Sequence, residues 1–243
     1  MSDQLAKIDP AAMALREALD AKWVDKTAVL TVNHPSGSVL APTIIIARRA
    51  GGTGASMLAL VLEFLLQHKA LIIEVGGNRC PAFKHRSPEN HRHFQSQDAD
   101  RIAHAMDARL DHPGRIAILE FEPALYRDTL PVACRLAEME PLCPPMLFYI
   151  ACRNESSPLF AEKAAQRGLN ELFMCRQAEQ RCEPQSDEFL VLPWLDQAIT
   201  GPLWREGITL PEAITRCRGV WTKEETRVNL EAFVEAILKR STV

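Results

Sequence analysis

The chain has 243 residues, a formal net charge of −3, 47% hydrophobic residues and 24% charged residues. These values are ordinary for a folded globular protein, and they exclude a disordered tail, a collagen-like chain and a strongly basic nucleic-acid coat protein. The length is sufficient for one large domain with its own hydrophobic core.

The cysteine pattern and the short apolar runs indicate the environment of the protein. Seven cysteines are scattered along the chain without any CxxC pair, which is typical of reduced thiols in a cytosolic protein. Wholly apolar runs, such as Met57 to Leu62, are far shorter than the ~20 residues of a spanning helix. The polar N-terminus has no signal-peptide core. We therefore expect a cytoplasmic protein without integral membrane association.

Residues 1–40 are predicted to form a short N-terminal extension with one helix and one strand. Asp9 and Pro10 are typical of a helix start, and apolar residues then recur every four positions up to Trp23. Residues 28–32 read as a strand that ends in a turn. We expect the apolar stripe of the helix to pack on the main body; docking to a partner or a membrane surface is the alternative.

Residues 41–243 are predicted to form a single α/β domain in which apolar strands alternate with helices. The predicted strands are 43–47, 71–73, 116–119, 146–150, 172–174 and 189–192. The predicted helices are 56–68, 98–110, 128–139, 158–167 and a last one that opens with a capping box at Thr222–Glu225. Continuously apolar strands between helices predict a mostly parallel sheet with helices on both faces and a ligand crevice at the carboxyl ends of its strands.

The most informative segment is a glycine-rich turn between the first predicted strand of this domain and its first helix. It contains Gly51, Gly52 and Gly54, and Ser56 then opens the helix. In a strand–loop–helix context, glycines bring backbone N–H groups close to a phosphate. The simpler interpretation is a tight turn without a ligand, but three glycines at a buried helix start favour a phosphate loop.

Residues 50–56, which read AGGTGAS, resemble the deviant P-loop of the ParA/MinD family of plasmid-partition and positioning ATPases, KGGxGK[ST]. The three glycines and the terminal hydroxyl match the family pattern. Ala50 and Ala55 stand where the family has its two lysines.

The resemblance extends from Thr43 to the end of the chain. Residues 71–76 correspond to the family strand that ends in an acidic pair, and residues 118–122 correspond to its Walker-B strand. Residues 189–195 correspond to the late strand and the proline-containing loop near the adenine. The resemblance implies a P-loop NTPase-like fold with ATP and Mg²⁺ as cofactors.

The resemblance implies catalytic and binding roles for Glu74, Glu120 and residues of the glycine-rich loop. Glu74 and Glu120 are the candidate catalytic residues, and Ser56 and Glu120 would hold Mg²⁺ once a nucleotide is bound. The candidate nucleotide-binding residues are Arg49, Gly51, Gly52, Thr53, Gly54, Ala55, Ser56 and Met57.

The missing lysines determine the expected chemistry. A P-loop lysine places a positive charge on the β and γ phosphates, which the methyl group of Ala55 cannot do. Since phosphoryl transfer depends on positioning and charge stabilisation, we expect weak or absent ATP hydrolysis. Arg48 and Arg49 lie just upstream and are the cations that could replace the lysines.

The function implied is that of a ParA/MinD-like protein with a degraded P-loop, similar to small plasmid-borne accessory proteins of the TraL or StbB type. Such a protein would act in plasmid maintenance, partition or conjugative DNA transfer through a protein partner, and would contact nucleic acid only indirectly or through a local basic patch. A homodimer around two nucleotides is the family arrangement, but the loss of the lysine at Ala50 puts that dimer in question.

Two alternatives remain open at this point. The first is a non-catalytic interaction scaffold whose nucleotide loop is a relic. The second is a dinucleotide- or phosphometabolite-binding α/β enzyme, in which Glu74, 20 residues after Gly54, would contact a ribose.

Two further groups of residues carry weaker signals. The polar loop 79–93 contains Cys80, His85, His91 and His93, but their spacing matches no standard zinc module. Its basic residues could contact a phosphate or a partner, while a solvated charged loop is the simplest interpretation. The two tryptophans that flank the late proline-containing region, at 194 and 204, read as packing residues, with an aromatic facing the adenine as the alternative.

Overall fold

The computed structural model describes residues 32–33, 39–66, 70–95, 98–141, 144–152, 158–169 and 172–240. The predicted helix between Asp9 and Trp23, and the predicted strand 28–32 apart from its last residue, lie outside these ranges. At the start of the described part, β1 (Val32–Asn33) pairs antiparallel with β2 (Val39–Leu40).

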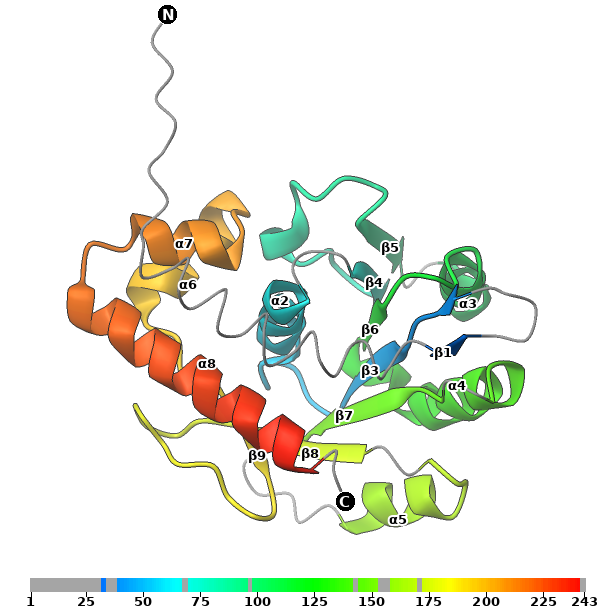
Figure 1. Ribbon diagram of the computed structural model, residues 1–243. Helices are drawn as coiled ribbons and strands as arrows, with labels where there is room; N and C mark the ends of the chain where they lie inside the picture. The colour runs from blue at the N-terminus through cyan, green and yellow to red at the C-terminus, as the bar shows by residue number, and fades with distance from the viewer. Residues whose placement is uncertain are drawn as a thin grey trace, which may run out of the picture.

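A seven-stranded parallel sheet forms the centre of the molecule (Figure 1). The strands follow the order β5-β4-β6-β3-β7-β8-β9, and each neighbouring pair runs parallel. Their bounds are β3 Thr43–Arg48, β4 Leu71–Gly76, β5 His91–Gln95, β6 Ala117–Phe121, β7 Met146–Ile150, β8 Leu172–Gln177 and β9 Leu190–Leu192. The predicted α/β fold with a mostly parallel sheet is confirmed.

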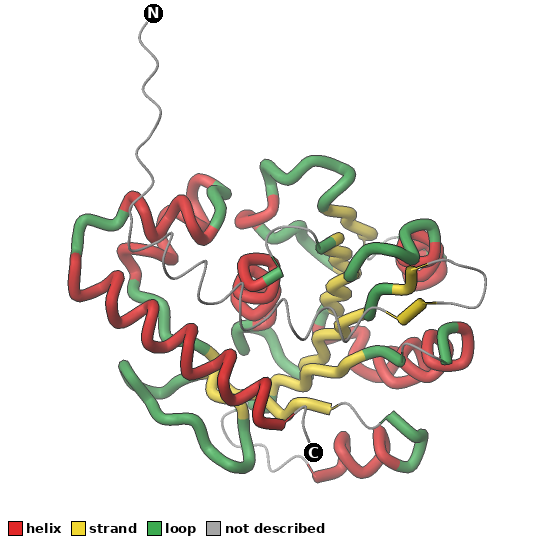
Figure 2. The backbone as a smooth tube through the Cα atoms, viewed as in Figure 1, coloured by secondary structure: helices red, strands yellow, loops and turns green. Residues whose placement is uncertain are grey.

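Helices cover both faces of the sheet, as Figure 2 shows. One face packs against α2 (Ala55–Leu65), α6 (Gln197–Glu206), α7 (Leu210–Arg216) and α8 (Val220–Arg240). The other face packs against α3 (Arg101–Leu110), α4 (Tyr126–Met139) and α5 (Pro158–Ala165). Within the described ranges, each helix is too short or too polar to cross a bilayer.

The central strands are apolar because both of their faces are covered. Ile44 and Ile46 of β3 enter the core on the α2 side, whereas Ile45 and Ala47 enter the core on the opposite side. Successive side chains of a strand alternate between the two faces, so a strand between two helical layers needs apolar residues at every position. This is why β3, β4, β6 and β7 were recognisable as strands in the sequence.

Apart from shifted ends of elements, the structure differs from the sequence prediction in three places. Residues 91–95 form the edge strand β5 and not a loop, because backbone pairing with β4 makes up for a polar sequence. The helices α6 and α7 were not predicted. The predicted capping box at the last helix is wrong, because α8 begins at Val220 and Thr222 lies inside the helix. The carbonyl oxygen of Thr222 accepts a hydrogen bond from the Thr226 hydroxyl.

A fully buried arginine joins three elements on the α3–α4 side of the sheet. The Arg109 Nη2 donates to the carbonyl oxygen of Ala41 at 2.6 Å and to Glu140 Oε2 at 3.1 Å. Its Nε donates to the hydroxyl of Thr43 at the start of β3. Because both charges are withdrawn from water, each depends on the other for compensation.

We expect Arg109→Ala to lower the free energy of unfolding by about 3–5 kcal/mol, because the variant leaves Glu140 buried without its cation. Urea denaturation followed by circular dichroism measures this loss. Arg135→Ala is the matched control, since Arg135 and Glu138 pair on α4 with 64% and 67% of their side chains exposed. That change should cost less than about 0.5 kcal/mol. Equal losses in the two variants would contradict the role of Arg109.

Candidate functional site

The glycine-rich loop leaves the carboxyl end of β3 and enters α2. Gly52 has φ +71° and Gly54 has φ +90°, a left-handed backbone conformation that favours glycine. A Cβ atom on Gly54 would lie 3.0 Å from Gln177 Nε2 and 3.2 Å from Leu192 Cδ1. Both the backbone conformation and the close approach of its neighbours therefore require glycine at position 54.

The loop is held by hydrogen bonds from its own residues and from β8. The Gln177 side-chain amide donates to the carbonyl oxygen of Gly52 at 3.0 Å. The Thr53 hydroxyl donates to the carbonyl oxygen of Ala50 at 3.3 Å. Gln177 was missed in the sequence because the predicted strand ended at residue 174, whereas β8 continues to Gln177.

The N-terminus of α2 offers unsatisfied backbone donors. Gly54 is the N-cap residue, and among the described residues no side chain caps the helix and no acidic residue lies in its first turn. The first hydrogen bond toward the helix interior runs from the Leu58 N–H to the Gly54 carbonyl oxygen at 2.8 Å. The N–H groups of the three preceding residues have no partner within the helix, so this end favours an anion.

A cavity of about 450 Å³ adjoins this helix end, within the range of small-molecule sites. Its lining joins the loop to a late segment of the chain and consists of Arg48, Gly52, Gly54, Ala55, Ser56, Met57, Gln177, Ala178, Leu192, Pro193, Trp194, Leu195 and Trp204. The structure thus brings most of the predicted loop residues together with both tryptophans. The indole N–H of Trp194 is buried and has no hydrogen-bond partner in the described part of the chain.

Three of the predicted nucleotide-binding residues lie elsewhere. Gly51 and Thr53 line a neighbouring cavity of about 510 Å³, between the loop and the end of β8. Arg49 is exposed and lines neither cavity. Of the two arginines considered in the sequence, Arg48 is the one that faces the 450 Å³ cavity.

Glu120 connects the loop to the neighbouring strand β6. The Ser56 hydroxyl donates to Glu120 Oε1 at 2.7 Å, and Arg48 Nη2 lies 2.9 Å from the same oxygen. The Glu120 side chain is 3% exposed, and its Oε2 has no hydrogen-bond partner among the described residues. The predicted pair of Ser56 and Glu120 is therefore in contact, with Arg48 as a third member.

The environment of Glu120 alters its proton affinity. Burial raises the pKa of Glu120 from its ordinary value of 4.5 to about 7. The Arg48 charge and the Ser56 hydrogen bond oppose this effect, while the nearby charge of Glu74 adds to it. Desolvation of the carboxylate outweighs the two favourable contacts.

The residues around Ser56 do not fit a Mg²⁺ ion well. Mg²⁺ requires oxygen ligands in near-octahedral geometry, and the Glu120 oxygen nearest to Ser56 is already occupied by the Arg48 guanidinium. In the described part of the chain, no group of three or more His, Cys, Asp or Glu side chains is placed to hold a metal.

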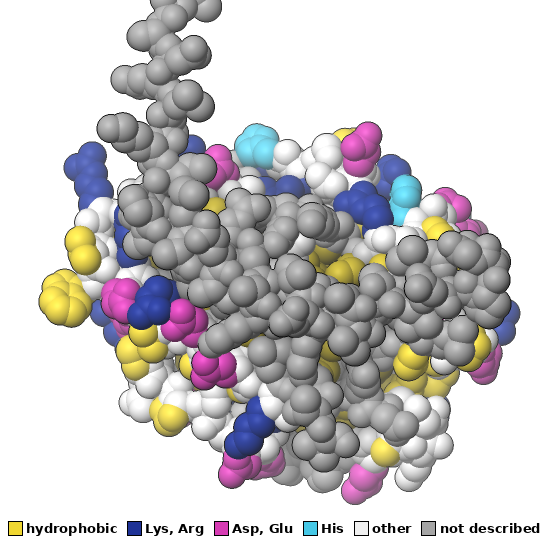
Figure 3. Space-filling view, viewed as in Figure 1, with side chains coloured by type: hydrophobic (Ala, Val, Ile, Leu, Met, Phe, Trp, Pro, Cys, Tyr) yellow, Lys and Arg dark blue, Asp and Glu magenta, His cyan; other side chains and the backbone are white. Residues whose placement is uncertain are grey.

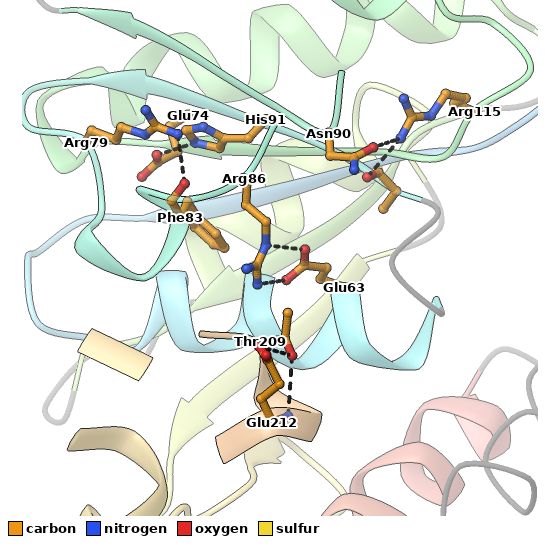
Figure 4. Close-up of polar contacts among 11 residues, drawn as sticks. Glu63, Glu74, Arg79, Phe83, Arg86, Asn90, His91, Arg115, Thr209 and Glu212 are labelled. Carbon is orange, nitrogen blue, oxygen red and sulfur yellow. Dashed lines mark hydrogen bonds and ion pairs between the residues drawn. The ribbon is translucent and has the colours of Figure 1, made fainter. Parts of the chain in front are cut away.

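Glu74 is engaged in the structure and lies away from the cavity. It accepts the Cys80 N–H on Oε1 at 2.9 Å, and its Oε2 lies 2.6 Å from His91 Nε2 (Figure 4). Its strand β4 is separated from β3 by β6, whereas in a dinucleotide-binding fold the strand with the acidic residue adjoins the glycine strand. This topology argues against a ribose-binding role for Glu74.

The segment predicted as a solvated loop, residues 79–93, is partly buried. Arg86 binds both carboxylate oxygens of Glu63 on α2, at 2.7 and 2.8 Å (Figure 4). Cys80 is buried, and burial raises the pKa of its thiol to about 12. His91 stacks on Phe83 with ring centroids 5.3 Å apart. These contacts give the segment a structural role.

A search with protein-family models finds no match for the chain, and a comparison with curated protein sequences also finds none. The resemblance to the ParA/MinD family therefore depends on the residues of the loop and the strands alone.

The raised pKa of Glu120 predicts a pH-dependent stability. Between pH 4.5 and about pH 7, the folded protein keeps the Glu120 proton that the unfolded chain has released, so stability falls as the pH rises through this window. Glu120→Gln keeps an oxygen acceptor but cannot ionise. We expect wild type to lose on the order of 2 kcal/mol relative to this variant over that window, or roughly 5 °C in Tm.

Thermal melts from acidic to slightly alkaline pH test this expectation. Glu138→Gln is the control, because the Glu138 side chain is 67% exposed on α4. This variant should follow the wild-type pH profile. A Glu120→Gln profile parallel to wild type would show that Glu120 titrates normally.

Proposed function

We propose that this protein is a degenerate P-loop protein of the ParA/MinD type. In this proposal it binds a nucleotide through its phosphates, hydrolyses it weakly or not at all, and acts through a protein partner in plasmid maintenance, partition or conjugative DNA transfer. The observation that carries the proposal is the 450 Å³ cavity, in which the loop residues Gly52 and Gly54–Met57 adjoin the segment Leu192–Leu195.

The position of the loop supports phosphate binding. The loop follows the central strand β3, at the carboxyl end of the parallel sheet, where ligands of open α/β sheets bind. The carboxylate that the resemblance assigns to the Walker-B strand, Glu120, lies on the adjacent strand β6 and contacts Ser56. Both relationships agree with a P-loop NTPase-like arrangement.

The remainder of the cavity suits a nucleotide base. Pro193, Trp194, Leu195 and Trp204 supply apolar and aromatic surface, on which a planar base can pack. The Trp194 N–H is buried and has no partner among the described residues, so it would donate to a ligand only after its indole edge turns toward the cavity. The resemblance assigns the same proline-containing segment to the adenine.

The charges in the cavity support weak hydrolysis. Among the lining residues that the structure describes, Arg48 is the single cation, and its guanidinium already contacts Glu120. The Ala55 methyl group is fully buried, at the position of the family lysine. A bound triphosphate would therefore lack the separate cations that stabilise charge on the transferred phosphoryl group.

A non-catalytic interaction scaffold is the second candidate. Two large apolar side chains at the start of α8, Val220 and Trp221, are 77% and 85% exposed. Exposed aromatic residues are typical of protein interfaces. On the part of the face in Figure 3 that grey atoms leave uncovered, Lys and Arg side chains are visible together with Asp and Glu side chains. Both candidates therefore include a protein partner.

Nucleotide binding is tested by thermal shift with ATP, ADP, GTP and NAD. At a hundredfold excess over Kd, a nucleotide would stabilise wild type by about 2.7 kcal/mol, which raises Tm by roughly 5–10 °C. Gly54→Val should abolish the shift, because its side chain would meet Gln177 and Leu192.

The control for this experiment is Gly168→Ala. Gly168 also has a positive φ, +74°, but it has open space around it and lies after α5. This variant should keep the full shift. No shift with any nucleotide would refute nucleotide binding and favour the scaffold, and a shift with NAD alone would favour the dinucleotide alternative.

Hydrolysis is tested by phosphate release from ATP. We expect wild type to release phosphate far more slowly than about one per second, and at most slightly faster than Gly54→Val, because the cavity lacks the lysine charge. Turnover on the order of one per second, as in efficient phosphoryl-transfer enzymes, would contradict this expectation.

A further inference from the structure

We infer that this loop binds the phosphates of its ligand without a divalent cation, because the Arg48 guanidinium takes the place of Mg²⁺ beside Ser56 and Glu120. This inference rests on the proposed function, since it concerns how the same cavity holds a phosphate. It assigns Arg48 as the residue that supplies positive charge to the site.

The geometry around Glu120 carries the inference. In a P-loop site, the hydroxyl at the start of the helix ligates Mg²⁺, and a carboxylate on a strand helps to hold the ion. Here the corresponding groups contact each other directly, with 2.7 Å between Ser56 Oγ and Glu120 Oε1. Arg48 Nη2 lies 2.9 Å from that same Oε1. The guanidinium thus satisfies the carboxylate oxygen that a metal would otherwise share with Ser56.

Arg48 is held in this position by the backbone of β6. Its Nε donates to the carbonyl oxygen of Phe121 at 3.3 Å, and its side chain is 16% exposed. Ile46 and Glu120 are register partners on the adjacent strands β3 and β6, so Arg48 leaves β3 next to the residues it contacts. Its contacts with Glu120 and with the Phe121 carbonyl oxygen, both on β6, hold the Arg48 side chain in one position, unlike that of an exposed surface arginine.

The charge of Arg48 favours a phosphate and opposes a metal. A divalent cation next to Ser56 would lie within contact range of the guanidinium, and like charges at such distances repel each other. A guanidinium carries five N–H donors; the Arg48 Nε donates to Phe121, and the Glu120 contact is an ion pair. Because Arg48 lines the cavity, its remaining N–H donors are available to a ligand there. The planar guanidinium group suits phosphate oxygens, which it can bind with two parallel hydrogen bonds.

A second observation points to a ligand in the cavity. The buried indole N–H of Trp194 has no acceptor among the described residues, although Trp194 lines the same cavity as Arg48. A buried donor without a partner is costly, and a ligand with acceptor atoms would satisfy it once the indole edge turns toward the cavity. Among the described residues, the unpaired Oε2 of Glu120 is a group that can still recruit Mg²⁺, so metal dependence is the rival outcome of the test.

Calorimetric titration of the full chain with ATP, in EDTA and in excess Mg²⁺, tests the inference. We expect ATP to bind in EDTA at least as tightly as in Mg²⁺. Binding that requires Mg²⁺ would overturn the inference and leave the proposed nucleotide site in place. Absence of binding under both conditions would overturn the proposed function together with the inference.

Variants of Arg48 test its role in the same titrations. Arg48→Ala should weaken ATP binding in EDTA about tenfold or more, because a charge-assisted contact is lost. It should also bind ATP more tightly in Mg²⁺ than in EDTA, because the metal then has access to Ser56 and Glu120. A purely structural role for Arg48 would not reverse this ratio. Unchanged affinity in EDTA would overturn the role of Arg48.

Two further variants complete the design. Arg48→Lys keeps the cation, so it should retain metal-independent binding even if Arg48→Ala does not fold; metal-dependent binding by this variant would overturn the inference. Arg135→Ala removes one positive charge from an exposed pair on α4, across the sheet from the loop, and should leave both affinities unchanged. If Arg135→Ala and Arg48→Ala weakened ATP binding equally, the effect would come from net charge alone, and the assignment of Arg48 as the phosphate-binding cation would be overturned.

Discussion

The carboxylate of Glu120 is the constraint on which the loop end of the sheet depends. It is 3% exposed, so the protein must compensate it with donors from within. Ser56 donates a hydrogen bond to this carboxylate and Arg48 supplies an opposite charge, and the two residues come from the two ends of the glycine loop. The residues at the two ends of the loop, Arg48 and Ser56, thus contact the same oxygen atom, Oε1 of Glu120 on β6. This arrangement fixes the start of α2 relative to β3 and orients its free N–H groups toward the cavity.

How far the fold could be predicted depends on which force shapes each element. The strand β3 was recognisable because burial on both faces demands an unbroken apolar run. The strand β5 was not, because it is held by backbone pairing with β4 and by the contact of His91 with Glu74, which no periodicity shows. The helix α7 could have been found, since Thr209 and Glu212 form a capping box that is visible in the sequence.

The candidate site was predictable in its loop but not in its charges. Glycine spacing identifies a phosphate loop because it reflects local backbone geometry. The roles of Arg48 and Arg49 could not be separated, because neighbouring residues at a strand end direct their side chains to different sides. Gln177 is 125 residues away from Gly52 along the chain, so its contact with the loop depends on the sheet order. Similarly, the engagement of Glu74 follows from an edge strand that was not predicted.

The two edges of the sheet have a consequence for self-assembly. The edge strand β5 has five residues and carries an exposed arginine, Arg92, while the opposite edge strand β9 has three residues. Short strands and charged side chains prevent an open edge from adding strands of another chain. Within the described residues, the edges of this sheet therefore disfavour strand pairing between the sheets of two copies of this protein, whereas the helical layers and the loops carry no such barrier.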